Sequence, residues 1–277
     1  MLVTLMLLLG ASLAAAQPVR IGIPERDNLQ YLAFWVAQGA GLFKAEGLEV
    51  EVIYPDVPNQ SGMILMQKRV DISLLQPPVY LGLIAEQHPF ALFANLLAND
   101  PINLIVRRDV ADRLKLDPKA PLPDRLAAIK GLRAGVAPEP PRRMRMLFTQ
   151  AGMNADQEVR IVIRRAEDQL EAFTSDAVDA LYTHSPALED AIVRLGAVIY
   201  VNQSSGEIAP LAGGQIHSLG ATREYIAAHP EVIRKVTRAI ARAQQLIHAN
   251  TRTVIDALTT VGISAPTPAH FDTILSL

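Results

Sequence analysis

The chain repeats one order of strand-like and helix-like segments, and this repeat constrains its fold more than any other feature. In the first half, strand-like runs at 19–23, 48–53 and 71–75 are separated by helical patterns that begin near Leu29 and Gln60. Strands that alternate with helices predict a parallel sheet with helices on both faces.

The second half follows the same order. Strand-like runs at 132–136, 159–163 and 178–182 correspond to the three runs of the first half. The alignment rests on Val178-Asp179, which matches Val70-Asp71. We therefore predict two similar α/β lobes in one chain; a single six-stranded sheet is the alternative.

Two further strand-like segments, at 103–107 and 215–219, flank the second repeat, and we expect the chain to cross between lobes near each. The predicted organisation is a signal peptide at 1–16, a first lobe at 17–101, a second lobe at 102–213, and a return to the first lobe with C-terminal helices at 214–277.

Residues 1–16 have the pattern of a secretory signal peptide. The apolar run Leu2–Leu9 is too short for a bilayer span, which needs about 20 residues, and Ala14-Ala15-Ala16 suits signal peptidase. The alternative is a buried core helix. No Lys or Arg precedes the run, which a start codon farther upstream would explain. We expect a periplasmic protein that begins at Gln17 and has no stable membrane insertion.

Composition argues against several classes of protein. The chain has no cysteine, which removes disulfides, thiolate metal ligands and cysteine nucleophiles. Its six histidines lie far apart, and the net charge is -2. We therefore expect no metal, no cofactor and no nucleic-acid partner.

Four short stretches point to a known family. They are Ala40–Phe43 followed by Glu46–Val50, then Val70–Ile72, Lys130–Val136 and Val178–Ala180. In order and spacing they resemble the periplasmic substrate-binding proteins of ABC importers, in the group that takes sulfonates, nitrate, taurine and thiamine-pyrimidine precursors. The resemblance covers nearly the whole chain after residue 16.

The resemblance implies a two-lobed type II periplasmic-binding-protein fold, in which each lobe is a mostly parallel sheet flanked by helices. It implies a small-molecule ligand in the cleft between lobes, an ABC transporter permease as partner, a monomer, and no enzymatic activity. Such proteins usually run longer after the helical start at Pro268–Phe271, so a further C-terminal helix is expected beyond Leu277.

Ligands of open α/β sheets bind outside the carboxyl ends of parallel strands, so two facing lobes form the walls of one cleft. The predicted ligand-binding residues follow the strands of both lobes: Asp27, Asn28, Tyr31, Gln76, Pro77, Tyr80, Asn95, Glu139, Arg142, Tyr182 and His184. Gln76 and His184 match each other, five residues after the aspartate of each repeat. The alternative roles are helix capping for Asp27 and Asn28, and packing for the tyrosines.

The residues leave the ligand's charge open. A helix that begins at Pro141 would point its N–H groups at the cleft, and Arg142 suits a carboxylate, sulfonate or phosphate. The acids Glu25, Asp27 and Glu139 instead suit an amine or a heterocyclic N–H. We predict capture of a small organic molecule for an ABC importer. The alternative is a small-molecule enzyme, a lyase or a biosynthetic enzyme, with His184 in an acid–base pair.

Overall fold

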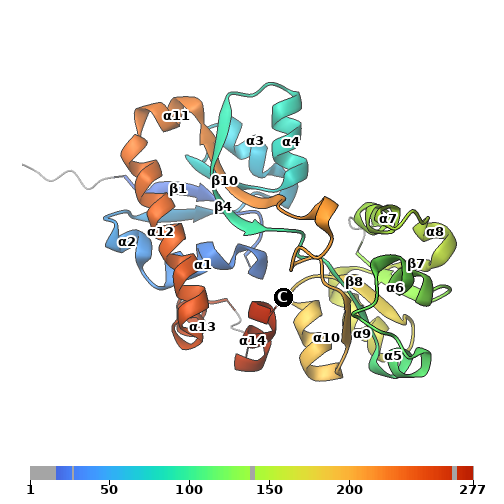
Figure 1. The fold of residues 1–277 in the computed structure, drawn as a ribbon. Helices are drawn as coiled ribbons and strands as arrows, with labels where there is room; N and C mark the ends of the chain where they lie inside the picture. The colour runs from blue at the N-terminus through green and yellow to red at the C-terminus, as the bar shows by residue number, and fades with distance from the viewer. Residues whose placement is uncertain (1–16, 27, 138–140, 264–266, 277) are drawn as a thin grey trace, which may run out of the picture.

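The computed structural model describes residues 17–26, 28–137, 141–263 and 267–276 of the 277-residue chain. Two lobes lie beside each other, each built on a five-stranded mixed sheet with helices around it (Figure 1). This confirms the two-lobed prediction, and the alternative of one six-stranded sheet is wrong.

The first-lobe sheet has the strand order β2–β1–β3–β10–β4. Its strands are β1 (Val19–Gly22), β2 (Val50–Ile53), β3 (Ile72–Leu75), β4 (Phe90–Ala98) and β10 (Gln215–Thr222). Strand β1 is parallel to β2 and β3, whereas β10 is antiparallel to β3 and β4.

The second-lobe sheet has the equivalent order β7–β6–β8–β5–β9. Its strands are β5 (Asn103–Val106), β6 (Arg133–Val136), β7 (Arg160–Ile163), β8 (Ala180–Thr183) and β9 (Val198–Val201). Again three strands are parallel, and β5 is antiparallel to its neighbour β8. Strand β9 was not predicted.

Helices surround both sheets. Those of the first lobe are α1 (Leu32–Gly39), α2 (Leu42–Ala45), α3 (Ser61–Met66), α4 (Pro77–Ala85), α11 (Arg223–Ala228), α12 (Pro230–Ala249) and α13 (Thr251–Thr260). Those of the second are α5 (Arg108–Leu114), α6 (Leu122–Ala128), α7 (Pro141–Gln150), α8 (Ala155–Glu158), α9 (Gln169–Thr174) and α10 (Ala187–Leu195). Helix α14 (Pro268–Ser276) lies between α13 and α10 (Figure 1).

The same ion pair occurs at the same place in both lobes. The backbone N, Nε and Nη2 of Arg20 donate to the Asp71 carboxylate at 2.9, 3.2 and 2.7 Å. Arg133 donates to Asp179 through the same three atoms at 2.8, 2.9 and 2.8 Å. The Val-Asp alignment of the two half-sequences is therefore a structural equivalence, held by a bidentate arginine in each lobe.

Helix α1 is buried and holds the loop that follows β1. Phe34 and Trp35 are at most 2% exposed, and the Trp35 indole N–H donates to the Asn28 carbonyl at 3.2 Å. Helix α13 approaches so closely that a Cβ on Gly39 would lie 2.0 Å from the Ala257 carbonyl oxygen. These contacts hold both ends of α1 in place, and with it the polar residues after β1.

The chain crosses between the lobes twice, from β4 to β5 and from β9 to β10. The Asn99 side chain ties the crossings together, because its Nδ2 donates to the Ser204 carbonyl at 2.9 Å and its Oδ1 accepts from the Gly213 N–H at 2.8 Å. The predicted boundaries at 101/102 and 213/214 fall within these crossings and stay a prediction.

Candidate functional site

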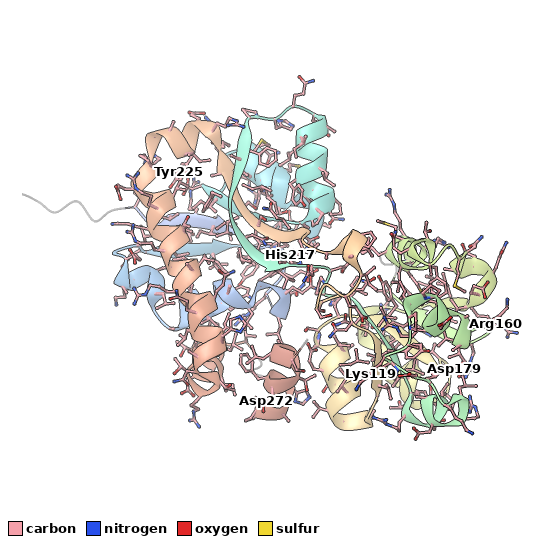
Figure 2. All side chains as sticks on the ribbon, viewed as in Figure 1. Lys119, Arg160, Asp179, His217, Tyr225 and Asp272 are labelled. Carbon is pink, nitrogen blue, oxygen red and sulfur yellow. The ribbon has the colours of Figure 1, made fainter. Side chains whose placement is uncertain are left out.

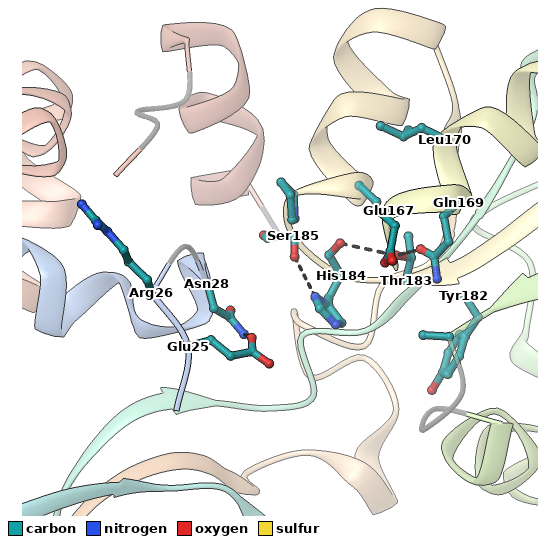
Figure 3. Close-up of a pocket in the computed structure, with 13 residues that line it drawn as sticks. Glu25, Arg26, Asn28, Glu167, Gln169, Leu170, Tyr182, Thr183, His184 and Ser185 are labelled. Atoms are coloured by element: carbon teal, nitrogen blue, oxygen red, sulfur yellow. Dashed lines mark hydrogen bonds between the residues drawn. The ribbon is translucent and has the colours of Figure 1, made fainter. Parts of the chain in front are cut away.

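A cavity of about 570 Å³ lies between the lobes, outside the carboxyl ends of β1, β6 and β8 (Figure 3). Its described lining comprises Glu25, Arg26, Asn28, Ala137, Glu167, Gln169, Leu170 and residues 182–187. Both lobes therefore contribute a wall. A concave site at the carboxyl ends of parallel strands is where α/β proteins bind ligands.

The first-lobe wall is the loop between β1 and α1. The Asn28 Oδ1 accepts from the Gln30 N–H at 2.9 Å, while its Nδ2 donates to Glu25 Oε2 at 3.0 Å. Asn28 thus caps the 3₁₀ turn Leu29–Tyr31 and also lines the cavity. The Arg26 guanidinium points away from the second lobe toward the end of α13, whereas Glu25 points into the space between the lobes (Figure 3).

The second-lobe wall centres on His184. Its Nδ1 lies 2.7 Å from the Ser185 carbonyl oxygen, which only accepts, so Nδ1 carries the ring proton. Burial lowers the pKa of His184 below its ordinary 6.5 and keeps the ring neutral near pH 7. The second nitrogen, Nε2, is consequently a hydrogen-bond acceptor.

Gln169 supplies the complementary donor. Its side chain lines the cavity although the residue is 1% exposed, and its Oε1 accepts from the Thr183 hydroxyl. Its Nε2 has no hydrogen-bond partner in the part of the chain that the structure describes. The amide nitrogen is left for a group inside the cavity.

A second layer of polar contacts lies behind this wall. The Ser185 hydroxyl donates to Glu189 of α10, a carboxyl group that is 3% exposed and whose pKa burial raises above its ordinary value. The adjacent Asp190 accepts from His270 Nε2 of α14 at 3.0 Å. Because Phe271 of α14 belongs to the first-lobe core, this helix connects the cavity wall to the other lobe.

Beside the cavity, β10 carries a buried polar cluster. His217 lies where the two lobes meet (Figure 2), and its ring packs edge-on against Tyr31 with centroids 5.0 Å apart. Gln76 Nε2 donates to the Tyr31 hydroxyl at 2.9 Å. His217 Nε2 donates to Gln30 Oε1, and burial lowers the pKa of His217 to about 3.

Of the predicted ligand-binding residues that the structure describes, Asn28, Tyr182 and His184 line the cavity. Asp27 and Glu139, either of which the enzyme alternative would pair with His184, lie outside the described residues. The Tyr182 hydroxyl is satisfied by Gln203, 3.2 Å from its Oε1. Whether any of these residues binds a ligand stays a prediction.

Five predicted first-lobe residues and one second-lobe residue lie elsewhere. Those outside the described cavity lining are Tyr31, Gln76, Pro77, Tyr80, Asn95 and Arg142. Of these, only Arg142 belongs to the second lobe. Tyr31 and Gln76 bind each other, Pro77 opens α4, and the Tyr80 hydroxyl donates to the Gln215 carbonyl at 2.8 Å.

Two of those placements need a correction. Asn95 was expected to follow a strand, but β4 continues to Ala98 and Asn95 pairs with Ser218 inside the sheet. Its Oδ1 accepts from the Ser218 hydroxyl at 3.2 Å. Arg142 is exposed on α7, and its neighbour Arg143 instead contacts Asp100 at 3.2 Å, beside the crossing.

Sequence reasoning missed Glu167, Gln169 and Leu170, which follow the edge strand β7, and the buried His217 in β10. No spacing pattern marks them. Within the described ranges, no helix is long and apolar enough to cross a membrane, and no three His, Asp or Glu side chains are grouped as metal ligands.

Several solved structures share this architecture. The periplasmic aliphatic sulphonate binding protein SsuA from Escherichia coli is 15% identical with a TM-score of 0.68, covering 93% of this chain and 83% of that one. A Bordetella bronchiseptica RB50 protein is 21% identical with a TM-score of 0.64, covering 94% and 80%. The periplasmic nitrate-binding protein NrtA from Synechocystis PCC 6803 is 14% identical with a TM-score of 0.61, covering 87% and 65%.

These likenesses show the type II periplasmic-binding-protein fold that the sequence predicted. No curated protein matches the chain. Residues 16–260 match the NMT1-like family, and this range includes almost all of the two-lobed fold. The chain therefore belongs to the NMT1-like family.

Proposed function

We propose that this protein captures a small organic molecule between its lobes and delivers it to an ABC importer. The observation that carries the proposal is the cavity of about 570 Å³, with one wall from each lobe. Family membership and the names of the similar proteins, sulphonate-binding and nitrate-binding, support it.

The two walls explain how the transporter would distinguish the ligand-bound protein from the empty one. A ligand that contacts Asn28 on one lobe and His184 on the other stabilises the arrangement in which the walls are close. Closure would turn the lobes about the two crossings that Asn99 holds together. A permease that prefers the closed arrangement then receives only the loaded protein.

The proposed location is the periplasm, reached through the signal peptide predicted at 1–16. The similar proteins SsuA and NrtA are both named as periplasmic. Periplasmic delivery also fits a monomer that meets its permease from outside the cytoplasmic membrane.

Mass spectrometry of small molecules released from the natively purified protein, followed by calorimetry with the compound found, tests this function. His184→Ala should weaken binding by about five- to hundredfold, because one ligand hydrogen bond is lost. His248→Ala, at an exposed position of α12, is the matched control and should bind like the parent. Unchanged affinity in His184→Ala would reject this cavity as the binding site.

A further inference from the structure

Charge at the cavity is unbalanced. Three charged side chains line its described part: Glu25, Arg26 and Glu167. Arg26 Nη2 lies 3.4 Å from the Gly262 carbonyl oxygen at the end of α13, and Glu167 lies 3.3 Å from Arg165 Nε. Glu25 has the neutral Asn28 amide as its partner and points into the space between the lobes, whereas Arg26 points away from the second lobe, so the charge that faces His184 is negative (Figure 3).

Arg143, a cation whose charge acts on His184, is already paired. The charge of Arg143 acts on His184, but so does that of Asp100, which lies 3.2 Å from Arg143 Nη1. Their opposite charges largely cancel at the cavity. A negatively charged ligand would thus meet the Glu25 carboxylate between the lobes, whereas the Arg26 guanidinium points away from the second lobe toward backbone carbonyls (Figure 3).

The hydrogen-bonding groups that face the space between the lobes also favour a ligand that donates hydrogen bonds. His184 Nε2 accepts, because Nδ1 holds the proton against Ser185. Glu25 and His184, from opposite lobes, point toward the same space in Figure 3, and the Glu25 charge acts on the His184 ring. Two acceptors therefore converge there, and Gln169 Nε2 offers one donor farther into the second lobe.

We infer that the ligand presents a positively charged N–H group, of the amine or amidine kind, to Glu25 and His184. Its apolar body would lie against Leu170 and Ala187, and an acceptor atom would face Gln169. A sulfonate or nitrate offers only acceptors, which would leave both acceptors of the protein unpaired in a closed cleft. The inference rests on the proposed function, since it takes this cavity as the ligand site.

Four aromatic probes of similar shape separate charge from size: benzamidine, benzamide, benzoate and benzenesulfonate. Calorimetry on the full chain near neutral pH should show benzamidine binding at least about tenfold more tightly than either anion. Glu25→Gln should weaken benzamidine about tenfold and change benzamide by less than about threefold, because only the charge is lost. Glu171→Gln, an exposed glutamate of α9 outside the cavity, is the matched control.

Tighter binding of benzoate or benzenesulfonate would overturn the inference, as would a Glu25→Gln variant that keeps full benzamidine affinity. Failure of all four probes to bind at about 10 mM would overturn it too, since even a poor aromatic cation should bind in that range. If the compound released from the native protein is an anion whose affinity falls in His184→Ala, the charge inference fails and the proposed function stands.

Discussion

Acid should destabilise this protein partly through His217, the buried histidine of β10. Burial, followed by the positive charge of Arg143, lowers the pKa of His217 from 6.5 to about 3. Between these values the unfolded chain binds a proton on this ring that the folded chain does not bind. Stability is therefore fully present above pH 6.5 and falls as the pH falls toward 3.

The size of the effect follows from the two pKa values. One proton of difference is worth about 1.4 kcal/mol per pH unit. Integrated from about pH 7 to about pH 4.5, the His217 contribution to the free energy of unfolding falls by about 2.5 kcal/mol. His217→Gln keeps an N–H for Gln30 Oε1 and has no titrating group, so it should lack this loss.

Urea unfolding at these two pH values measures this loss in the free energy of unfolding. The parent should lose about 2.5 kcal/mol more than His217→Gln between them, while other acid-sensitive groups act equally on both proteins. His248→Gln, on the exposed face of α12, controls for the exchange of histidine for glutamine. Equal losses in the parent and His217→Gln would refute a neutral, buried His217.

Further predictions concern packing and the connection between lobes. Gly39→Ala should lower the free energy of unfolding by about 3 kcal/mol, because its Cβ would overlap a backbone carbonyl of α13. Gly82→Ala, at an open position of α4, should raise it by about 0.5–1 kcal/mol. Asp179→Ala should cost about 1–3 kcal/mol, since its arginine partner loses a bidentate contact; urea unfolding measures all three. His270→Ala removes the contact with Asp190 and should increase the radius of gyration of the ligand-free protein in X-ray scattering; an unchanged value would contradict a restraining role for α14.

The repeated strands were predictable because two independent patterns coincide in them. Each third strand is apolar, and each follows a Val-Asp pair whose aspartate binds the arginine of the first strand. Strand β9 escaped prediction because it begins two residues after Gly196, close behind α10, and Val198–Val201 is uniformly apolar. A short apolar run without alternation does not distinguish a strand from the end of a helix.

The site was predictable where a residue directly follows a central strand. His184 lines the cavity because it directly follows β8, whose carboxyl end faces the cleft, whereas Gln76 at the matching place after β3 binds Tyr31 instead. Gln169 depends on the first turn of α9 and on a contact with Thr183, which no spacing reveals. Arg142 lies outside the described cavity lining for a geometric reason: neighbouring positions on a helix point about 100° apart, so Arg143 rather than Arg142 meets Asp100.

The central claim is that the two lobes close on a small molecule. The chain has no cysteine, so Ala85→Cys at the end of α4 and Gln150→Cys at the end of α7 provide two unique, exposed spin-label sites, one on each lobe. Double electron–electron resonance then measures the label-to-label distance with and without the compound released from the native protein. We predict a shorter and narrower distance distribution at saturating ligand; a distribution that the ligand leaves unchanged would contradict closure between the lobes.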